Sequence, residues 1–138
     1  MMELENCSLP HDENCFACGC RNEEGLQLKF RVVDEGVVET EFFPRMIFQS
    51  YKNTLHGGVQ ALLLDSCMVQ AVRSFGLLSK TAKLELKYKQ KVSLAESLRV
   101  KAFVKKRIGN FFIVEAQIHQ NELIKTMAFG TFRILDKE

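Results

Sequence analysis

The stretch that decides the fold is the longest apolar run of the chain, His56-Gly57-Gly58-Val59-Gln60-Ala61-Leu62-Leu63-Leu64-Asp65-Ser66-Cys67-Met68-Val69-Gln70-Ala71-Val72. Apolar residues occur on nearly every side of a helix drawn through it, which is typical of a buried helix. Gly76 stands where helices commonly end, because glycine readily adopts the left-handed conformation there. We therefore predict one buried helix over residues 57–75, with Asn53 or Thr54 as candidate caps.

Alternation of apolar and polar residues predicts strands on both sides of this helix. Two precede it, one beginning near Leu26 and one over residues 37–43, with a turn at Asp34-Glu35-Gly36 between them. Four follow it, over residues 83–89, 98–106, 111–119 and 123–135. One buried helix among six strands predicts an α+β fold, an antiparallel six-stranded sheet wrapped around one long central helix.

The first 24 residues are polar, rich in cysteine and without periodicity. We expect residues 1–24 to form an irregular leader and residues 25–138 to form the folded domain. Because the N-terminus lacks the basic and apolar regions of a signal peptide, we expect a cytoplasmic protein. No apolar run approaches the roughly 18 residues that span a bilayer, so no membrane association is expected.

Composition narrows the class further. The chain has 138 residues, of which 46% are hydrophobic and 26% charged, as in a soluble globular protein of one domain. The formal net charge of +2 is too small to indicate a nucleic-acid partner.

The cysteine pattern has two interpretations. Cys15-x-x-Cys18-x-Cys20, with Cys7 and His11 upstream, resembles part of a zinc site, but a second ligand pair at zinc-finger spacing is missing. Since the total of five is odd, we expect reduced thiols and no metal. Cys67, within the helix, is interpreted as a small core residue.

The start of the helix carries the first chemical signal. Gly57 and Gly58 allow close approach of a ligand to the backbone, and the first N–H groups of a helix have no partners within it. Such a helix start can bind an anion or a developing oxyanion. The alternative is that the glycines only permit a tight loop.

Asp65 is the second signal, because it lies in the most apolar part of the helix. A carboxylate there is costly unless it is paired or used in chemistry. It is either satisfied by a donor or serves as a general base or nucleophile. His56 and Asp65 are nine residues apart, about 900° around the helix and about 13.5 Å along it. If both act in one reaction, one of them must come from another copy of the chain, which predicts at least a dimer.

These residues resemble a known family. His56-Gly57-Gly58 followed by Asp65 on the one long helix is similar to the PaaI-type acyl-CoA thioesterases of the hotdog-fold superfamily. Phe48-Gln49-Ser50-Tyr51, Cys15-Phe16-Ala17-Cys18-Gly19, Gly25–Phe30, Thr81 with Leu84 and Tyr88, and Ala128-Phe129-Gly130-Thr131-Phe132 also resemble segments of that family. The resemblance covers about residues 15–135.

The resemblance implies hydrolysis of acyl-CoA to free acid and CoA, without a metal or redox cofactor. It implies that Asp65 activates water or attacks the thioester, and that the Gly57 N–H of the opposing subunit polarises its carbonyl. His56 would shape that end of the site together with Gly58. Thr81 falls where some relatives carry a hydroxyl that positions water, and Ser50 falls where some relatives carry an asparagine.

The phosphates of CoA need cationic partners. Lys105, Lys106 and Arg107 form the basic cluster that we expect to bind them, although a solvated surface is the alternative. Two other functions stay open, a non-catalytic acyl-CoA binding or sensing domain and a hotdog dehydratase or hydratase. The acyl group, and a dimer as opposed to a tetramer, are not determined by these patterns.

Overall fold

The computed structural model describes residues 2–4 and 13–136. Its elements are, in order, β1 (Met2–Leu4), β2 (Phe30–Asp34), β3 (Val37–Phe42), the 3-10 helix η2 (Met46–Phe48), α1 (Gly57–Arg73), β4 (Ser79–Tyr88), β5 (Leu98–Ile108), β6 (Phe111–Gln120) and β7 (Leu123–Ile134).

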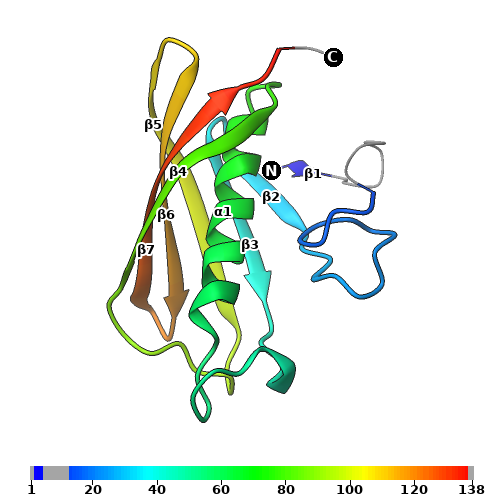
Figure 1. Ribbon diagram of the computed structural model, residues 1–138, viewed down its shortest axis with the longest axis vertical. Helices are drawn as coiled ribbons and strands as arrows, with labels where there is room; N and C mark the ends of the chain where they lie inside the picture. The colour runs from blue at the N-terminus through cyan, green and yellow to red at the C-terminus, as the bar shows by residue number, and fades with distance from the viewer. Residues whose placement is uncertain (1, 5–12, 137–138) are drawn as a thin grey trace.

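The strands form one antiparallel sheet in the order β1-β2-β3-β5-β6-β7-β4, which curves around α1 (Figure 1). The six expected strands and the central helix are confirmed. The leader, expected to be irregular, adds β1 as a seventh strand beside β2.

Three expected boundaries are corrected. The stretch from Leu26 to Leu28 is not part of a strand, because Gln27 has a left-handed φ of 48° and the Leu26 and Leu28 N–H groups donate to the carbonyls of Phe16 and Ala17, both at 2.9 Å. The helix begins after His56, which caps it in place of Asn53 or Thr54. It ends at Arg73 rather than at residue 75, because the chain tightens there and Gly76, at φ +79°, donates to the Arg73 carbonyl.

The core lies between α1 and the concave face of the sheet. Gly130 on β7 makes this close approach possible, since a Cβ at that position would lie 2.7 Å from the Met68 Cε atom of α1. The largest fully buried side chains come from the helix, from most of the sheet strands and from the loops flanking them: Phe30, Phe132, Leu55, Leu63, Leu64, Met68, Leu98, Ile118, Val38, Val72, Val92 and Val100.

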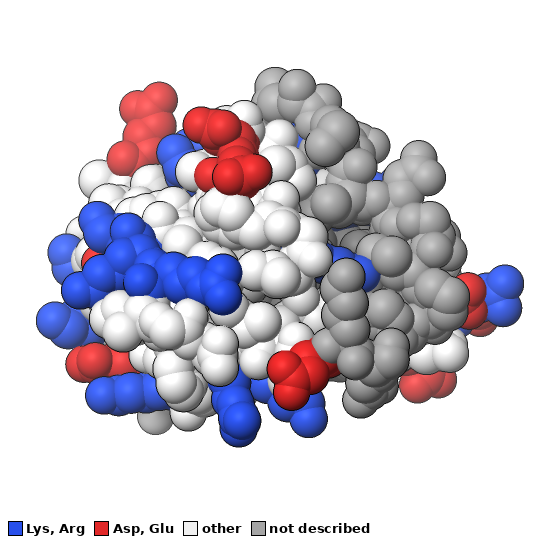
Figure 2. All heavy atoms as spheres, turned by 90° about the horizontal axis from the view of Figure 1, so that it is seen from above, with Lys and Arg blue, Asp and Glu red and all other residues white. Residues whose placement is uncertain are grey.

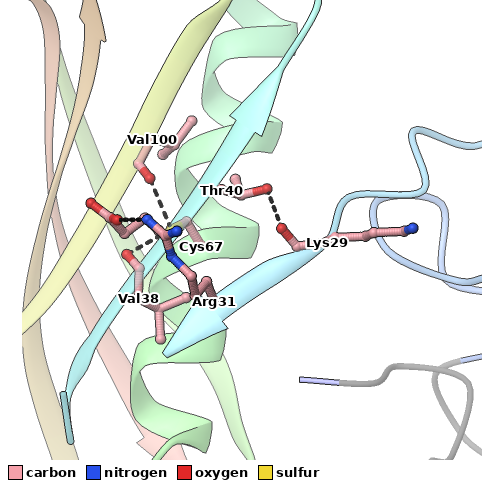
Figure 3. Close-up of polar contacts among 7 residues, drawn as sticks. Lys29, Arg31, Val38, Thr40, Cys67 and Val100 are labelled. Carbon is pink, nitrogen blue, oxygen red and sulfur yellow. Dashed lines mark hydrogen bonds and ion pairs between the residues drawn. The ribbon is translucent and has the colours of Figure 1, made fainter. Parts of the chain in front are cut away.

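Cys67 lies at the centre of this core, as predicted, with no exposed surface. Its Sγ atom is 3.4 Å from the Val38 carbonyl oxygen on β3 and 3.8 Å from that of Val100 on β5 (Figure 3). Burial raises the pKa of the Cys67 thiol, so it stays protonated and is not a nucleophile.

The leader from Glu13 to Gly25 folds against the domain as a tight loop. The Gly19 N–H donates to the Cys15 carbonyl at 2.8 Å, and the Arg21 N–H to that of Glu13 at 2.9 Å. Cys20 is disulfide-bonded, so the expectation of reduced thiols is wrong for this residue, whereas Cys15 is a free thiol and Cys18 is not disulfide-bonded. Cys7 and His11 lie outside the described residues.

Within residues 2–4 and 13–136, no group of three or more His, Cys, Asp or Glu side chains is arranged so that it could hold a metal ion. The same ranges hold no helix long and apolar enough to span a bilayer.

Candidate active site

His56 shapes the start of α1 as its N-cap residue. Its Nδ1 atom accepts a hydrogen bond from the Gly58 N–H at 2.9 Å, in the way that a Ser or Asp oxygen caps other helices. Accepting this bond requires Nδ1 to be unprotonated. The Gly58 N–H is therefore already engaged within its own chain.

Gly57 is held by Tyr88 of β4. The Tyr88 hydroxyl donates to the Gly57 carbonyl oxygen at 2.8 Å, and a Cβ on Gly57 would lie 3.3 Å from the Tyr88 ring. Among the described residues, the Gly57 N–H donates no hydrogen bond that the structure records. It lies at the positive end of the helix dipole, where an oxyanion would be stabilised.

Asp65 is contacted by the same strand. The Thr81 hydroxyl donates to Asp65 Oδ1 at 2.6 Å. A bulge in β4 makes this contact possible, because Thr81 pairs with Phe132 while Lys83 pairs with Thr131, which leaves Ala82 as an extra residue. The bulge places Thr81 on the same face of β4 as Leu84, Leu86 and Tyr88, toward the helix.

The surroundings of Asp65 favour its neutral form. Burial raises the pKa of the Asp65 carboxyl, and the hydrogen bond from Thr81 opposes part of that shift. No Lys, Arg or His within residues 13–136 forms an ion pair with Asp65. An unpaired carboxylate with a raised pKa suits proton transfer near neutral pH.

A cavity of about 430 Å³ begins beside Asp65. It extends along α1 toward Arg73 and is closed by the first residues of β4 and by the leader. The lining is mainly apolar, with a few polar groups, and its size suits a small organic ligand. The lining residues are Cys15, Phe16, Ala17, Cys18, Leu62, Asp65, Ser66, Val69, Gln70, Arg73, Leu77, Leu78, Ser79, Lys80 and Leu135.

The two chemical groups of the helix, Gly57 at its start and Asp65 in its middle, do not lie close together within one chain. Gly57 and Asp65 belong to the same continuous helix and are separated by eight residues, about 12 Å of rise. Ser50 lies in the loop before the helix, exposed, with its hydroxyl 3.4 Å from the Thr54 carbonyl. The structure brings Thr81 to Asp65 and Tyr88 to Gly57, but it does not bring the helix start to Asp65.

The basic cluster lies at the opposite end of the molecule from the helix start. Arg107 stacks over the ring of Phe112, which in turn stacks on Phe75, just beyond the last turn of α1. Lys105 is 4.0 Å from Glu115 and, like Lys106, is exposed. Figure 2 views this end of the molecule, where basic side chains gather on the surface. Lys105, Lys106 and Arg107 are therefore remote from Gly57 of their own chain.

Sequence patterns missed three groups at the site. Sequence periodicity places Tyr88 in a strand and gives no role to Gln70 or Ser79. Gln70 carried a usable signal, because a second amide in a helix that is apolar nearly all round is unusual. Tyr88 and Ser79 had none, since their contacts depend on how β4 crosses the helix.

Comparison with known proteins assigns this arrangement to a family. The model of the thioesterase superfamily matches residues 52–126, which include the helix, Asp65 and Thr81. The chain therefore belongs to the thioesterase superfamily, and its fold is the hotdog fold. The search of curated proteins returned no match.

Solved structures share this fold. A thioesterase superfamily protein superposes with a TM-score of 0.79 at 23% identity, over 84% of this chain and 61% of its own length. The PaaI protein from the phenylacetic acid degradation operon of Escherichia coli gives 0.75 at 17% identity, over 80% of this chain and 81% of its own. A hypothetical thioesterase from Streptococcus pneumoniae, solved with coenzyme A, superposes with a TM-score of 0.74 at 19% identity, over 80% of this chain and 87% of its own length.

Proposed function

We propose that the protein hydrolyses acyl-CoA thioesters to a free acid and CoA. The observation that carries this proposal is Asp65, a carboxylate without a cationic partner among the described residues, oriented by Thr81 at the wall of a largely apolar cavity. A binding domain has no evident need for such a carboxylate, because burial makes it costly. The superfamily match and the relative solved with coenzyme A support CoA as the carrier of the acyl group.

Two chemical routes use the same residue. In the first, Asp65 takes a proton from water as the water oxygen attacks the thioester carbon; the C–S bond then breaks, and the CoA sulfur takes the proton. In the second, an Asp65 oxygen attacks the carbon and the C–S bond breaks, releasing CoA as the thiolate; water then hydrolyses the resulting anhydride, and the proton that it releases converts the thiolate to the thiol. In both routes the carbonyl oxygen becomes negative and needs a hydrogen-bond donor.

That donor is the Gly57 N–H of a second copy of the chain. A separation of about 12 Å along one helix excludes a joint action of Gly57 and Asp65 from the same copy on one carbonyl. A two-fold dimer would form two equal sites, each joining the helix start of one subunit to Asp65 of the other. The basic cluster at Lys105, Lys106 and Arg107 is the candidate contact for the CoA phosphates in this assembly.

Release of free thiol from a panel of acyl-CoAs tests the reaction. We expect turnover by the wild type and a loss of about 10²–10⁴-fold in Asp65→Asn. Asp34→Asn, at the exposed last residue of β2, is the matched control and should retain activity. Undiminished hydrolysis by Asp65→Asn would contradict the assigned role, and tight acyl-CoA binding without turnover in the wild type would favour a sensor.

Mixed subunits test the shared site. Asp65→Asn and Gly57→Val chains are each expected to be inactive alone. After unfolding and refolding in equal amounts, half of the dimers would be mixed, and each mixed dimer would hold one intact site, restoring about a quarter of wild-type activity. No recovery, with mixed dimers verified by mass spectrometry, would contradict a site that joins Gly57 of one subunit to Asp65 of the other.

A further inference from the structure

Two buried glutamines on α1 differ in how their amides are satisfied. Gln60 and Gln70 are each 4% exposed. Gln60 donates to the Leu55 carbonyl at 3.1 Å and accepts from the Thr126 hydroxyl at 2.6 Å, so both ends of its amide are paired. The Gln70 Oε1 atom is buried without a hydrogen-bond partner among the described residues. A buried polar atom left unpaired is costly, and such atoms in native proteins commonly mark a missing ligand or water.

Ser79 presents a second buried polar atom of this kind. Its Oγ atom also lacks a hydrogen-bond partner within the described part of the chain. Ser79 pairs with Ile134, and Thr81 pairs with Phe132, so both hydroxyls lie on the face of β4 that turns toward α1. Tyr88 and Thr81 on this face each donate to a group of α1, whereas Ser79 does not.

Both unpaired atoms belong to residues that line the cavity beside Asp65. Gln70 is five residues beyond Asp65, which places it about 7.5 Å further along the helix and about 140° around it. Leu62 and Val69 of α1 and Leu77 after it give the cavity a largely apolar wall, and Ser66 is the lining residue next to Asp65. The cavity thus begins at a carboxylate, continues along mainly apolar side chains and is lined by two residues that each carry a buried, unpaired polar atom.

We propose that Gln70 and Ser79 are specificity-determining residues that select acyl groups with a hydroxyl at their distal end. A hydroxyl has one donor and two acceptor positions, so it can donate to Gln70 Oε1 while it accepts from the Ser79 hydroxyl. The apolar wall holds the carbon chain, and the carbonyl lies at Asp65. This proposal rests on the proposed thioesterase function, because it assigns the far end of that substrate.

Paired substrates that differ by one hydroxyl provide the test. Hexanoyl-CoA and ω-hydroxyhexanoyl-CoA are compared by kcat/KM in the wild type, in Gln70→Met, in Ser79→Ala and in the double variant. We expect the wild type to prefer the hydroxylated substrate by at least about tenfold, because a site built to bond a hydroxyl leaves polar groups unpaired with the analogue. The double variant should lose this preference mainly through a gain on hexanoyl-CoA. Ser97 is exposed and lies outside this cavity, so Ser97→Ala is the control and should keep the preference for the hydroxylated substrate.

The outcomes separate this proposal from the proposed function. Equal hydrolysis of both substrates by the wild type, or an unchanged preference in the folded double variant, would overturn the role of Gln70 and Ser79 while leaving thioesterase activity intact. If no acyl-CoA is hydrolysed, the proposed function fails. The subsite is then tested by comparing the affinities of the protein for ω-hydroxyhexanoate and hexanoate by calorimetry. Selective binding that disappears in the double variant would support the subsite, and equal binding would refute it. Circular dichroism verifies that each variant is folded.

Discussion

Thr81 Oγ1 lies 2.6 Å from Asp65 Oδ1, which connects the first strand after the helix back to the middle of that helix. The contact depends on Ala82, the extra residue of the β4 bulge, because regular alternation would place Thr81 on the opposite face from Leu84 and Leu86. A local irregularity of one residue therefore decides how the carboxylate is oriented.

Removal of this hydrogen bond should change the pH dependence of the reaction. The Thr81 hydroxyl lowers the pKa of Asp65 against the larger effect of burial, so Thr81→Val raises that pKa. We expect the acid limb of the kcat/KM profile to move to higher pH, with a loss of roughly tenfold at neutral pH, since a hydrogen bond to a charged group contributes about 1.5–3 kcal/mol. Thr81→Ser keeps the hydroxyl and should match the wild type. Superimposable profiles for the valine and serine variants would contradict this role.

Asp65→Asn should stabilise the fold at neutral pH. Burial raises the pKa of the folded Asp65 carboxyl above its unfolded value, so the folded state binds the proton more tightly. The resulting penalty is fully present above the raised pKa and diminishes as the pH falls through it toward the unfolded value. Thermal unfolding should therefore give a higher Tm for Asp65→Asn at neutral pH and a smaller difference near pH 4. A lower Tm at neutral pH would mean that the carboxylate has stabilising partners that outweigh its burial.

The capping role of His56 predicts which substitutions are tolerated. His56→Ala removes the acceptor of the Gly58 N–H and should lower the free energy of unfolding by about 1 kcal/mol, measured by urea denaturation. His56→Asp supplies another capping oxygen and should recover most of that loss. If activity recovers along with stability in the aspartate variant, His56 acts only by shaping the helix start. Recovery of stability alone would indicate that the imidazole contacts substrate.

Tyr88→Phe tests the support of Gly57. It removes the hydroxyl that donates to the Gly57 carbonyl and keeps the ring beside Gly57. We expect a loss of about 0.5–1.5 kcal/mol in unfolding free energy, as for other neutral hydrogen bonds. kcat should fall a few-fold. The acid limb of the pH profile should not change, because the Tyr88 hydroxyl contacts Gly57 and not Asp65. Tyr51→Phe, at a side chain that is 86% exposed, is the control and should change neither quantity.

The free cysteines should differ in reactivity. Cys15 is exposed, whereas Cys67 has no exposed surface and burial raises the pKa of its thiol. Iodoacetamide should modify Cys15 in the native protein, whereas Cys67 should react only after denaturation. Peptide mass spectrometry assigns the sites. Rapid native labelling of Cys67 would mean that the core opens around α1.

The amino-acid sequence by itself determined the features that arise from local periodicity. The apolar run from Val59 to Val72 specifies one buried helix, and alternation specifies the strands, because a side chain's position on a helix or strand follows from its place in the chain. Glycines before the run and a carboxylate within it marked the helix start and Asp65 as chemical groups. Their separation along one helix also followed from the sequence, since it is simple helical geometry.

Contacts between distant segments were decided only by the tertiary structure. The Thr81 and Tyr88 hydroxyls reach Asp65 and Gly57 because β4 lies at the edge of the sheet, beside β7, and carries a bulge there. The leader closes the cavity because its backbone pairs with Leu26 and Leu28. Gln60 accepts a hydrogen bond from Thr126 of β7, whereas Gln70 Oε1 has no such partner among the described residues, and the pattern within one segment carries no information about contacts with a distant strand. The chemical groups are local properties of the chain, whereas their partners depend on packing.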